Sequence, residues 1–206
     1  MSRGAQAGDL VPLVLATGNA DKVAELRLLL GHRYEVRPRP ADLAETVEDG
    51  ETLEANAEKK AREVVDHTGQ LAVADDTGLF VDALDGRPGV RTGRFAGPDA
   101  TYDENIDRLL ADLAHLDDPA ARRAEFRTVI VARWPDGRQI VVDGVVAGWI
   151  CQQRRGTAGF GYDPVFVPLE GDGRSFAEMA LEEKNQLSHR ARAIDELLVE
   201  LTGASS

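Results

Sequence analysis

Cysteine and long apolar runs are both scarce in this sequence. Cys151 is the one cysteine among 206 residues, which excludes an internal disulfide and a metal site made of thiolates alone. No window approaches the roughly 18 apolar residues that a membrane-spanning helix needs. The first ten residues also lack the apolar core of a signal peptide. We therefore expect a cytoplasmic protein that does not contact membranes.

Positive charge is scarce as well. The chain has 24 Lys and Arg residues against 36 Asp and Glu residues, which gives a formal net charge of -12. Nucleic-acid backbones are bound by clustered Lys and Arg, so this balance disfavours a nucleic-acid-binding protein. An anionic ligand would need a metal ion or a few well-placed cationic side chains to overcome the general repulsion.

The order of the predicted elements indicates an α/β fold. Residues 10–17 form a continuous apolar run, typical of a strand that is covered on both faces. A helix is predicted from its cap at Asn19 to Gly31, and a second helix between residues 50 and 69. Polar and apolar residues alternate on both sides of a turn within residues 125–150, which predicts an antiparallel hairpin. We expect one domain with a mixed central sheet flanked by helices.

Three later segments complete the predicted fold. Residues 85–98 are rich in glycine and predict a long shaped loop of the kind that often lines a site. Residues 101–115 predict an amphipathic helix. Residues 174–203 predict a single docked helix that closes the chain, because Ser175 and Glu178 have the spacing of a capping box at its start.

The stretch TGNADK, residues 17–22, lies where the first predicted strand meets the first helix. Free backbone N–H groups and the positive end of the helix would face any anion bound there. Asn19 and Lys22 could add side-chain donors. The stretch lacks the GxxxxGK pattern of a phosphate-binding Walker loop, so a capped turn with a solvated lysine remains the alternative.

Two adjacent carboxylates, Asp75 and Asp76, follow the apolar residues 71–74. Neighbouring residues of a strand point to opposite faces, so one carboxylate could face a cleft while the other hydrogen-bonds to a turn. An exposed carboxylate at the tip of a strand suits Mg²⁺, which prefers a few oxygen ligands together with water and phosphate. The alternative is an Asp pair that forms a turn before Thr77 and Gly78.

Three more polar clusters interrupt the apolar pattern. Glu48 lies in an acidic run before Lys60, and this run could equally be a solvated loop. The stretch AGFGYDPVF, residues 158–166, holds two aromatic rings and a carboxylate in a glycine-rich turn, which suits stacking on a planar ring. The stretch EEKNQLSHR, residues 182–190, carries Lys184 and Ser188 on one expected helical face and ends in a cationic pair. A hairpin turn and a charged helix surface are the structural alternatives for these two stretches.

The four stretches TGNADK, ADDTGLFVDAL, GFGYDPVF and EEKNQLSHR occur in an order and spacing that resemble the inosine triphosphate pyrophosphatase family. The resemblance covers residues 13 to 201. It implies one domain over residues 10–203, with two lobes and a cleft between them, and flexible termini at residues 1–9 and 204–206. It also implies a homodimer in the cytoplasm.

The resemblance also implies roles for individual residues. Asp76 matches the family's catalytic carboxylate, which acts as metal ligand and general base, and Glu48 matches a second carboxylate that binds Mg²⁺. The expected substrate-binding residues are Thr17, Gly18, Asn19, Ala20, Asp21, Lys22, Lys60, Thr77, Phe160, Gly161, Tyr162, Asp163, Lys184, His189 and Arg190.

The implied reaction splits ITP, dITP or XTP into the monophosphate and pyrophosphate. Water attacks the α-phosphorus while a metal ion and lysines neutralise the phosphate oxygens. Donors from His189 or Arg190 would favour a 6-keto purine and leave the amino group of adenine badly paired. Two alternatives remain open: a related pyrophosphatase for modified pyrimidine nucleotides, and a non-enzymatic nucleotide sensor with the same fold.

Overall fold

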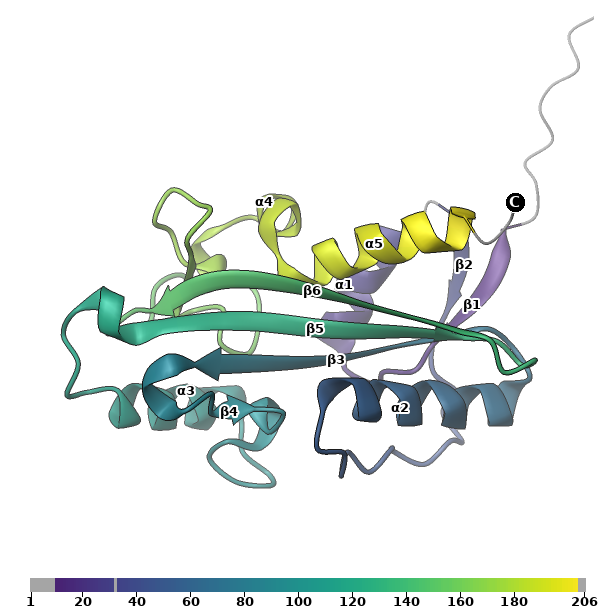
Figure 1. Ribbon diagram of the computed structural model, residues 1–206, viewed down its shortest axis with the longest axis horizontal. Coiled ribbons are helices and arrows are strands. Elements are labelled where there is room, and N and C mark those ends of the chain that lie inside the picture. Colours follow the sequence, from purple (N-terminus) through teal and green to yellow (C-terminus); the bar gives the residue numbers. More distant parts are fainter. Residues whose placement is uncertain (1–9, 32, 204–206) are drawn as a thin grey trace, which may run out of the picture.

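The computed structural model describes residues 10–31 and 33–203 (Figure 1). The termini that we expected to be flexible, residues 1–9 and 204–206, lie outside these ranges. Within them the chain forms seven strands and five α-helices. These elements are β1 (Val11–Leu15), α1 (Ala20–Leu30), β2 (Tyr34–Arg37), α2 (Leu53–Thr68), β3 (Ala72–Val81), β4 (Pro88–Gly89), α3 (Tyr102–Asp112), β5 (Arg123–Arg133), β6 (Gln139–Ile150), β7 (Phe166–Pro168), α4 (Leu181–Leu187) and α5 (His189–Gly203).

The strands form one mixed sheet, as predicted. The order is β2-β1-β3-β5-β6-β7, and the short β4 pairs with β3 outside this path. β1 runs parallel to β2 and β3, whereas β3, β5, β6 and β7 pair antiparallel. The predicted hairpin is therefore confirmed as β5 and β6. The expected division into two lobes stays a prediction.

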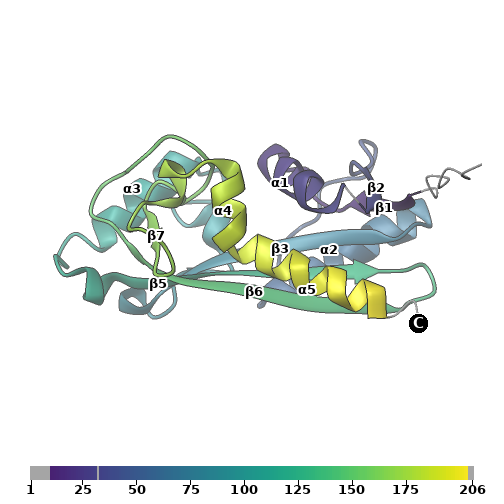
Figure 2. The same cartoon turned by 90° about the horizontal axis from the view of Figure 1, so that it is seen from above.

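Helices cover both faces of the sheet. α2 lies on one face and α5 on the other, where it follows β5 and β6 (Figures 1 and 2). α1 shares the face of α5, because Leu26 of α1 and Ile194 of α5 belong to one buried cluster with Leu13 of β1. On the opposite face, Ala57 of α2 packs with Ala72 of β3. Burial on both faces explains the continuous apolar runs of β1 and β3.

The first two predicted helices form where the sequence places their caps. Asn19 caps α1 by accepting hydrogen bonds from the backbone N–H groups of Asp21 and Lys22. Thr52 caps α2 in the same way, and Gly69 ends it with a positive φ of 63°, a conformation that glycine adopts without strain. In residues 10–31 and 33–203, no helix combines the length and the apolar character that a membrane span requires.

The carboxylate pair does not lie at the tip of a strand, and no turn begins at Gly78. β3 continues to Val81, so Asp75 and Asp76 lie in its middle. Gly78 is needed for close packing instead, because a Cβ atom there would lie 2.9 Å from the carbonyl oxygen of Gly89 in the paired β4. The prediction of a strand tip with a turn was therefore wrong.

The closing segment is not one helix. The capping box of Ser175 and Glu178 forms, but it encloses only a 3₁₀ turn, Phe176–Glu178. α4 follows and ends at Ser188, whose extended backbone (φ -70°, ψ 150°) separates it from α5. Lys184 and Ser188 therefore do not share one continuous helical face. The break places His189 and Arg190 at the first turn of a new helix, where both are buried.

Candidate functional site

A cavity of about 370 Å³ lies where the four sequence motifs meet. This volume is in the range of sites for small molecules. The predicted substrate-binding and metal-binding residues that line the cavity are Thr17, Gly18, Asn19, Lys22, Glu48, Lys60, Thr77, Phe160, Gly161, Tyr162, Asp163, Lys184, His189 and Arg190. Ala20, Asp21 and Asp76 are the predicted site residues that do not line it. The structure thus gathers 14 predicted site residues from distant parts of the chain around one space.

The turn between β1 and α1 forms one wall of the cavity. The Asn19 side chain is already engaged on both sides: its Oδ1 caps α1, and its Nδ2 donates to the Tyr102 hydroxyl at 2.8 Å. Lys22 is not a solvated lysine, because its Nζ lies 2.9 Å from Oδ2 of Asp75. Burial lowers the pKa of Lys22, although Asp75 counteracts this. The positive end of α1 and this lysine face the same space.

Asp75 is fully buried and forms the centre of a charge network. Its Oδ2 contacts Nζ of Lys22 at 2.9 Å and Nη2 of Arg190 at 3.3 Å. Burial alone would raise the pKa of Asp75, but these two cations outweigh it and hold the pKa far below its ordinary value. The expectation that this carboxylate hydrogen-bonds to a turn was wrong, since β3 has no turn here and side chains of α1 and α5 supply its partners.

Asp76 points to the opposite face of β3, toward α2, as the alternation of a strand requires. Its Oδ1 accepts from Lys60 Nζ at 2.8 Å and its Oδ2 from Asn56 Nδ2 at 3.1 Å. Only 5% of Asp76 is exposed, so the expected exposed carboxylate is in fact covered, because Lys60 lies over it. Burial raises the pKa of Asp76, and Lys60 only partly offsets this.

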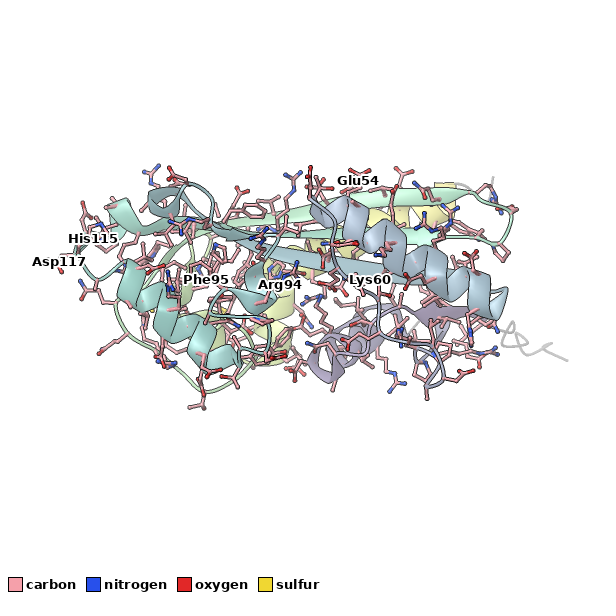
Figure 3. All side chains as sticks on the ribbon, turned by 90° about the horizontal axis from the view of Figure 1, so that it is seen from below. Glu54, Lys60, Arg94, Phe95, His115 and Asp117 are labelled. Carbon is pink, nitrogen blue, oxygen red and sulfur yellow. The ribbon has the colours of Figure 1, made fainter. Side chains whose placement is uncertain are left out.

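Lys60 joins the two predicted metal ligands. Its Nζ contacts Oε1 of Glu48 at 2.9 Å as well as Oδ1 of Asp76. Burial would lower the pKa of Lys60, but the two carboxylates outweigh it and raise the pKa. Arg94 also contacts Glu48 by donating to its backbone oxygen at 2.8 Å. Lys60 on α2 and Arg94 after β4 come from separate parts of the chain (Figure 3), and both contact Glu48.

The donor set around Lys60 is small. Within residues 10–31 and 33–203, no group of three or more His, Cys, Asp or Glu side chains could hold a metal ion. Of the described acidic side chains, Glu48 and Asp76 form ion pairs with the ammonium group of Lys60. Two carboxylates fit Mg²⁺, which usually completes its coordination with water and substrate phosphates. A closed site for a transition metal does not fit these residues.

Glu25 was not predicted as a site residue, yet it links the two cationic motifs. This α1 side chain is 3% exposed and contacts Nζ of Lys184 at 2.8 Å and Nη1 of Arg190. Burial would raise its pKa, but Arg190 and Lys184 outweigh it and hold the pKa of Glu25 below the ordinary value. In the sequence, Glu25 is one acidic residue in an amphipathic helix, which gives no signal of this role.

The segment Phe160–Asp163 forms the opposite wall. Asp163 is buried and accepts from Nζ of Lys184 at 2.6 Å and from the backbone N–H of Phe160 at 2.9 Å. Burial raises the pKa of Asp163, and Lys184 opposes this. The Tyr162 hydroxyl donates to the backbone oxygen of Thr92 at 3.1 Å. Asp163 and Tyr162 therefore shape the wall, and the half-buried Phe160 ring faces the cavity.

His189 lies against an aromatic ring. Its imidazole stacks on Phe126 with a centroid distance of 4.5 Å and an interplanar angle of 15°. Burial lowers its pKa well below 6.5, and the cations Arg190 and Lys184 lower it further. Its buried Nδ1 has no hydrogen-bond partner. A neutral imidazole that lines the cavity can donate one N–H hydrogen bond to a polar atom of a ligand.

Thr77 and Tyr102 also line the cavity. Thr77 Oγ1 lies 2.7 Å from Oγ1 of Thr128 and accepts from Nη2 of Arg190 at 3.2 Å. Tyr102, which sequence reasoning missed, lies beside Phe160 with a centroid distance of 6.0 Å. Together they place hydroxyl groups and a second aromatic ring near the turn after β1 and the segment Phe160–Asp163.

Comparisons with known proteins agree with this geometry. The profile of the Ham1 family matches residues 13–200. A Methylococcus capsulatus protein named dITP/XTP pyrophosphatase is 47% identical over 186 residues, which cover 88% of this chain and 91% of that protein. A protein of the same name from Streptococcus pyogenes serotype M3 is 43% identical over 194 residues. That alignment covers 93% of this chain but only 58% of the Streptococcus protein.

Solved structures show the same fold. A HAM1 protein from Coxiella burnetii matches with a TM-score of 0.84 and 37% identity, covering 94% of this chain and 100% of that one. A structure from Mycobacterium abscessus, described as nucleoside-triphosphatase and dITP/XTP pyrophosphatase, matches with a TM-score of 0.73 and 39% identity. It covers 93% of this chain and 100% of that one.

Proposed function

The chain belongs to the Ham1 family, and on this basis we propose that it hydrolyses deaminated purine nucleoside triphosphates to the monophosphate and pyrophosphate. The names of the Methylococcus and Streptococcus relatives support ITP-like substrates such as dITP and XTP. One observation carries the proposal. The cavity is lined by lysines and an arginine, and it lies beside the two carboxylates of Glu48 and Asp76 that share Lys60. This arrangement suits a polyanion that arrives with a divalent cation.

Glu48 and Asp76 are the proposed ligands of Mg²⁺. Both carboxylates already converge on one cation, the ammonium group of Lys60. When bound, Mg²⁺ would neutralise phosphate oxygens and favour ionisation of a nearby water. It would also offset the net charge of -12 that disfavours anionic ligands.

The residues of the chain have separate proposed tasks. Lys22, Lys60 and Lys184 line the cavity and would neutralise the triphosphate. The turn that contains Thr17 and the N-terminus of α1 offer backbone N–H groups to phosphate oxygens. Asp76 does not line the cavity and is bonded to Lys60, which does. It would accept a proton from the attacking water when Lys60 turns towards the phosphates.

We assign recognition of the base to the wall formed by Phe160–Asp163. The Phe160 ring offers a face for stacking. Arg190 is already committed, because it donates to Glu25, Asp75 and Thr77. His189 lines the cavity as a neutral imidazole, so we propose that its ring N–H is the main reader of the 6-keto edge. Guanine shares this keto group, so the contact that rejects GTP must act elsewhere on the ring.

Pyrophosphate release from ITP, XTP, GTP, ATP and a modified pyrimidine triphosphate tests the proposal, with Mg²⁺ and again with excess EDTA. Metal-dependent release from ITP and XTP far above GTP and ATP is expected. Comparable rates on GTP would contradict the substrate class, and selective release from the pyrimidine would favour that alternative. Binding of ITP without release would favour a nucleotide sensor.

The assembly and the cellular location are also proposals. We propose a homodimer that acts on the nucleotide pool of the cytoplasm. Light scattering coupled to size-exclusion chromatography should give twice the mass of the 22.3 kDa chain. A monomer at micromolar concentration would contradict the dimer without affecting the proposed reaction.

A further inference from the structure

Asn56 links Asp76 to the segment that carries Glu48, the other proposed ligand of the metal ion, and sequence reasoning did not select it. It belongs to the first turns of α2 and is completely buried. Its amide makes two hydrogen bonds: Nδ2 donates to Oδ2 of Asp76 at 3.1 Å, and Oδ1 accepts from the backbone N–H of Gly50 at 2.8 Å. One rigid amide therefore connects the middle of β3 to the segment that carries Glu48.

The contact with Gly50 depends on the absence of a side chain there. A Cβ atom at residue 50 would lie 2.6 Å from Oδ1 of Asn56 and 3.1 Å from Cβ of Ala55. Glu48 is only two residues before this glycine, in a segment without helix or strand. Because no ladder of backbone hydrogen bonds holds such a segment, its position depends on anchors of this kind.

The contact with Asp76 controls the orientation of its carboxylate. Lys60 donates to Oδ1 and Asn56 donates to Oδ2, so each oxygen has a different partner. Rotation of the carboxylate would break both bonds in a buried environment, where an unsatisfied polar group is costly. Asn56 is completely buried and both polar atoms of its amide are bonded within the protein, so it is not placed to touch substrate.

We propose that Asn56 is a positioning residue that fixes both the orientation of Asp76 and the distance from Asp76 to the Glu48 segment. This inference rests on the proposed hydrolysis. If Asn56 acts through the two proposed metal ligands, its replacement should lower turnover and metal affinity. A variant that loses the same stability elsewhere should not show these effects.

Two substitutions of Asn56 distinguish the loss of one hydrogen bond from the loss of both. Asn56→Asp keeps the size of the side chain and an acceptor for Gly50, but it replaces the donor to Asp76 with a carboxylate oxygen. Asn56→Leu has a similar volume and removes both bonds. Val64→Ala, in the buried core of the same helix, serves as a control that lowers stability without removing a polar contact.

Steady-state kinetics with ITP and thermal melting are measured for all variants. We expect Asn56→Asp to lower kcat at least about tenfold while KM for ITP stays within about twofold. Val64→Ala should keep the wild-type kcat even if its melting temperature falls as far as that of Asn56→Asp. If folded Asn56→Asp keeps the wild-type kcat, or if Val64→Ala loses the same fraction of kcat, the inference is wrong.

A second measurement does not depend on turnover. Calorimetry follows Mn²⁺ binding in the presence of an ITP analogue with a methylene group between the α- and β-phosphorus. Asn56→Leu should bind Mn²⁺ about tenfold more weakly than wild type, because the Glu48 segment is released. Asn56→Ala, which also removes both hydrogen bonds, replaces it if the leucine variant does not fold. Equal Mn²⁺ affinity in the folded variants would overturn the inference.

A failure of the proposed function can be distinguished from a failure of the inference about Asn56. If the wild-type chain releases no pyrophosphate from ITP, the proposed function fails and this inference fails with it. If the wild type is active and Asn56→Asp matches it, the function stands and only the role of Asn56 is refuted.

Discussion

The Nζ atom of Lys60 lies 2.8 Å from Oδ1 of Asp76, and both side chains are buried. The proposed catalytic carboxylate is therefore compensated by a cation of the chain itself. The same ammonium group also reaches Glu48 at 2.9 Å. A divalent cation that uses both carboxylates must share them with Lys60 or replace it, which makes this lysine a competitor as well as a partner of the metal.

Replacement of Lys60 tests this competition. Lys60→Met should bind Mn²⁺ without nucleotide about tenfold more tightly than wild type, because the buried Asp76 and the partly exposed Glu48 lose the cation that they share. Turnover of ITP should fall, because one cation near the phosphates is lost. Lys59→Met removes a neighbouring lysine that contacts Asp49 instead and serves as the control. Calorimetry that shows no gain in Mn²⁺ affinity for Lys60→Met would contradict competition.

Replacement of Asp76 tests its role as general base. Asp76→Asn keeps the shape of the side chain but cannot accept a proton from water, so ITP turnover should fall about 10²- to 10⁴-fold. The exposed Asp143 pairs with Arg127 on the sheet, and Asp143→Asn should leave turnover unchanged. Pyrophosphate release under saturating ITP and Mg²⁺ gives the comparison. Near-normal turnover of Asp76→Asn would exclude a role in proton transfer.

Replacement of His189 tests base recognition. His189→Leu preserves an apolar side chain against Phe126 but removes the ring N–H donor, so the preference for ITP over ATP should fall about 10- to 100-fold in kcat/KM. Leu187→Ala, a partly buried residue of α4, controls for loosened packing nearby. Competition kinetics with ITP and ATP provide the ratio. An unchanged ratio would transfer the reading of the 6-keto edge to another residue.

The acid stability of the fold depends on Glu25. Its pKa in the folded protein lies below the ordinary 4.5, so its stabilising effect is complete above about pH 5 and is lost as the pH falls through this lowered pKa. Glu25→Gln should lose about 3 kcal/mol at pH 7, because Lys184 and Arg190 keep buried charges without their carboxylate. Its stability should then change less than that of wild type between pH 5 and 3.

Urea unfolding at several pH values measures this difference. Glu196→Gln, at an exposed position of α5, gives the effect of removing a surface carboxylate. Parallel curves for Glu25→Gln and wild type below pH 5 would show that Glu25 does not link stability to pH.

The sequence was sufficient to predict the first three helices, the hairpin of β5 and β6, and the family, but not β2, β7 or the break between α4 and α5. Caps such as Asn19 and the alternation within β5 and β6 are local signals, because the hydrogen bonds and faces that they reflect involve residues close in the chain. The order of the four motifs predicted the family, and the Ham1 match over residues 13–200 confirms it. The gathering of the predicted residues around one cavity follows from this shared fold.

Only the tertiary structure decided which partner each charge has. The bond between Lys184 and Glu25 joins residues 159 positions apart, and the bond between Asn56 and Asp76 spans 20 positions and two different elements. The break at Ser188, which an amphipathic pattern does not reveal, also depends on where α4 and α5 pack. Hydrophobic periodicity reports which face of an element is buried, whereas the pairing of buried charges is fixed by the three-dimensional arrangement of those faces.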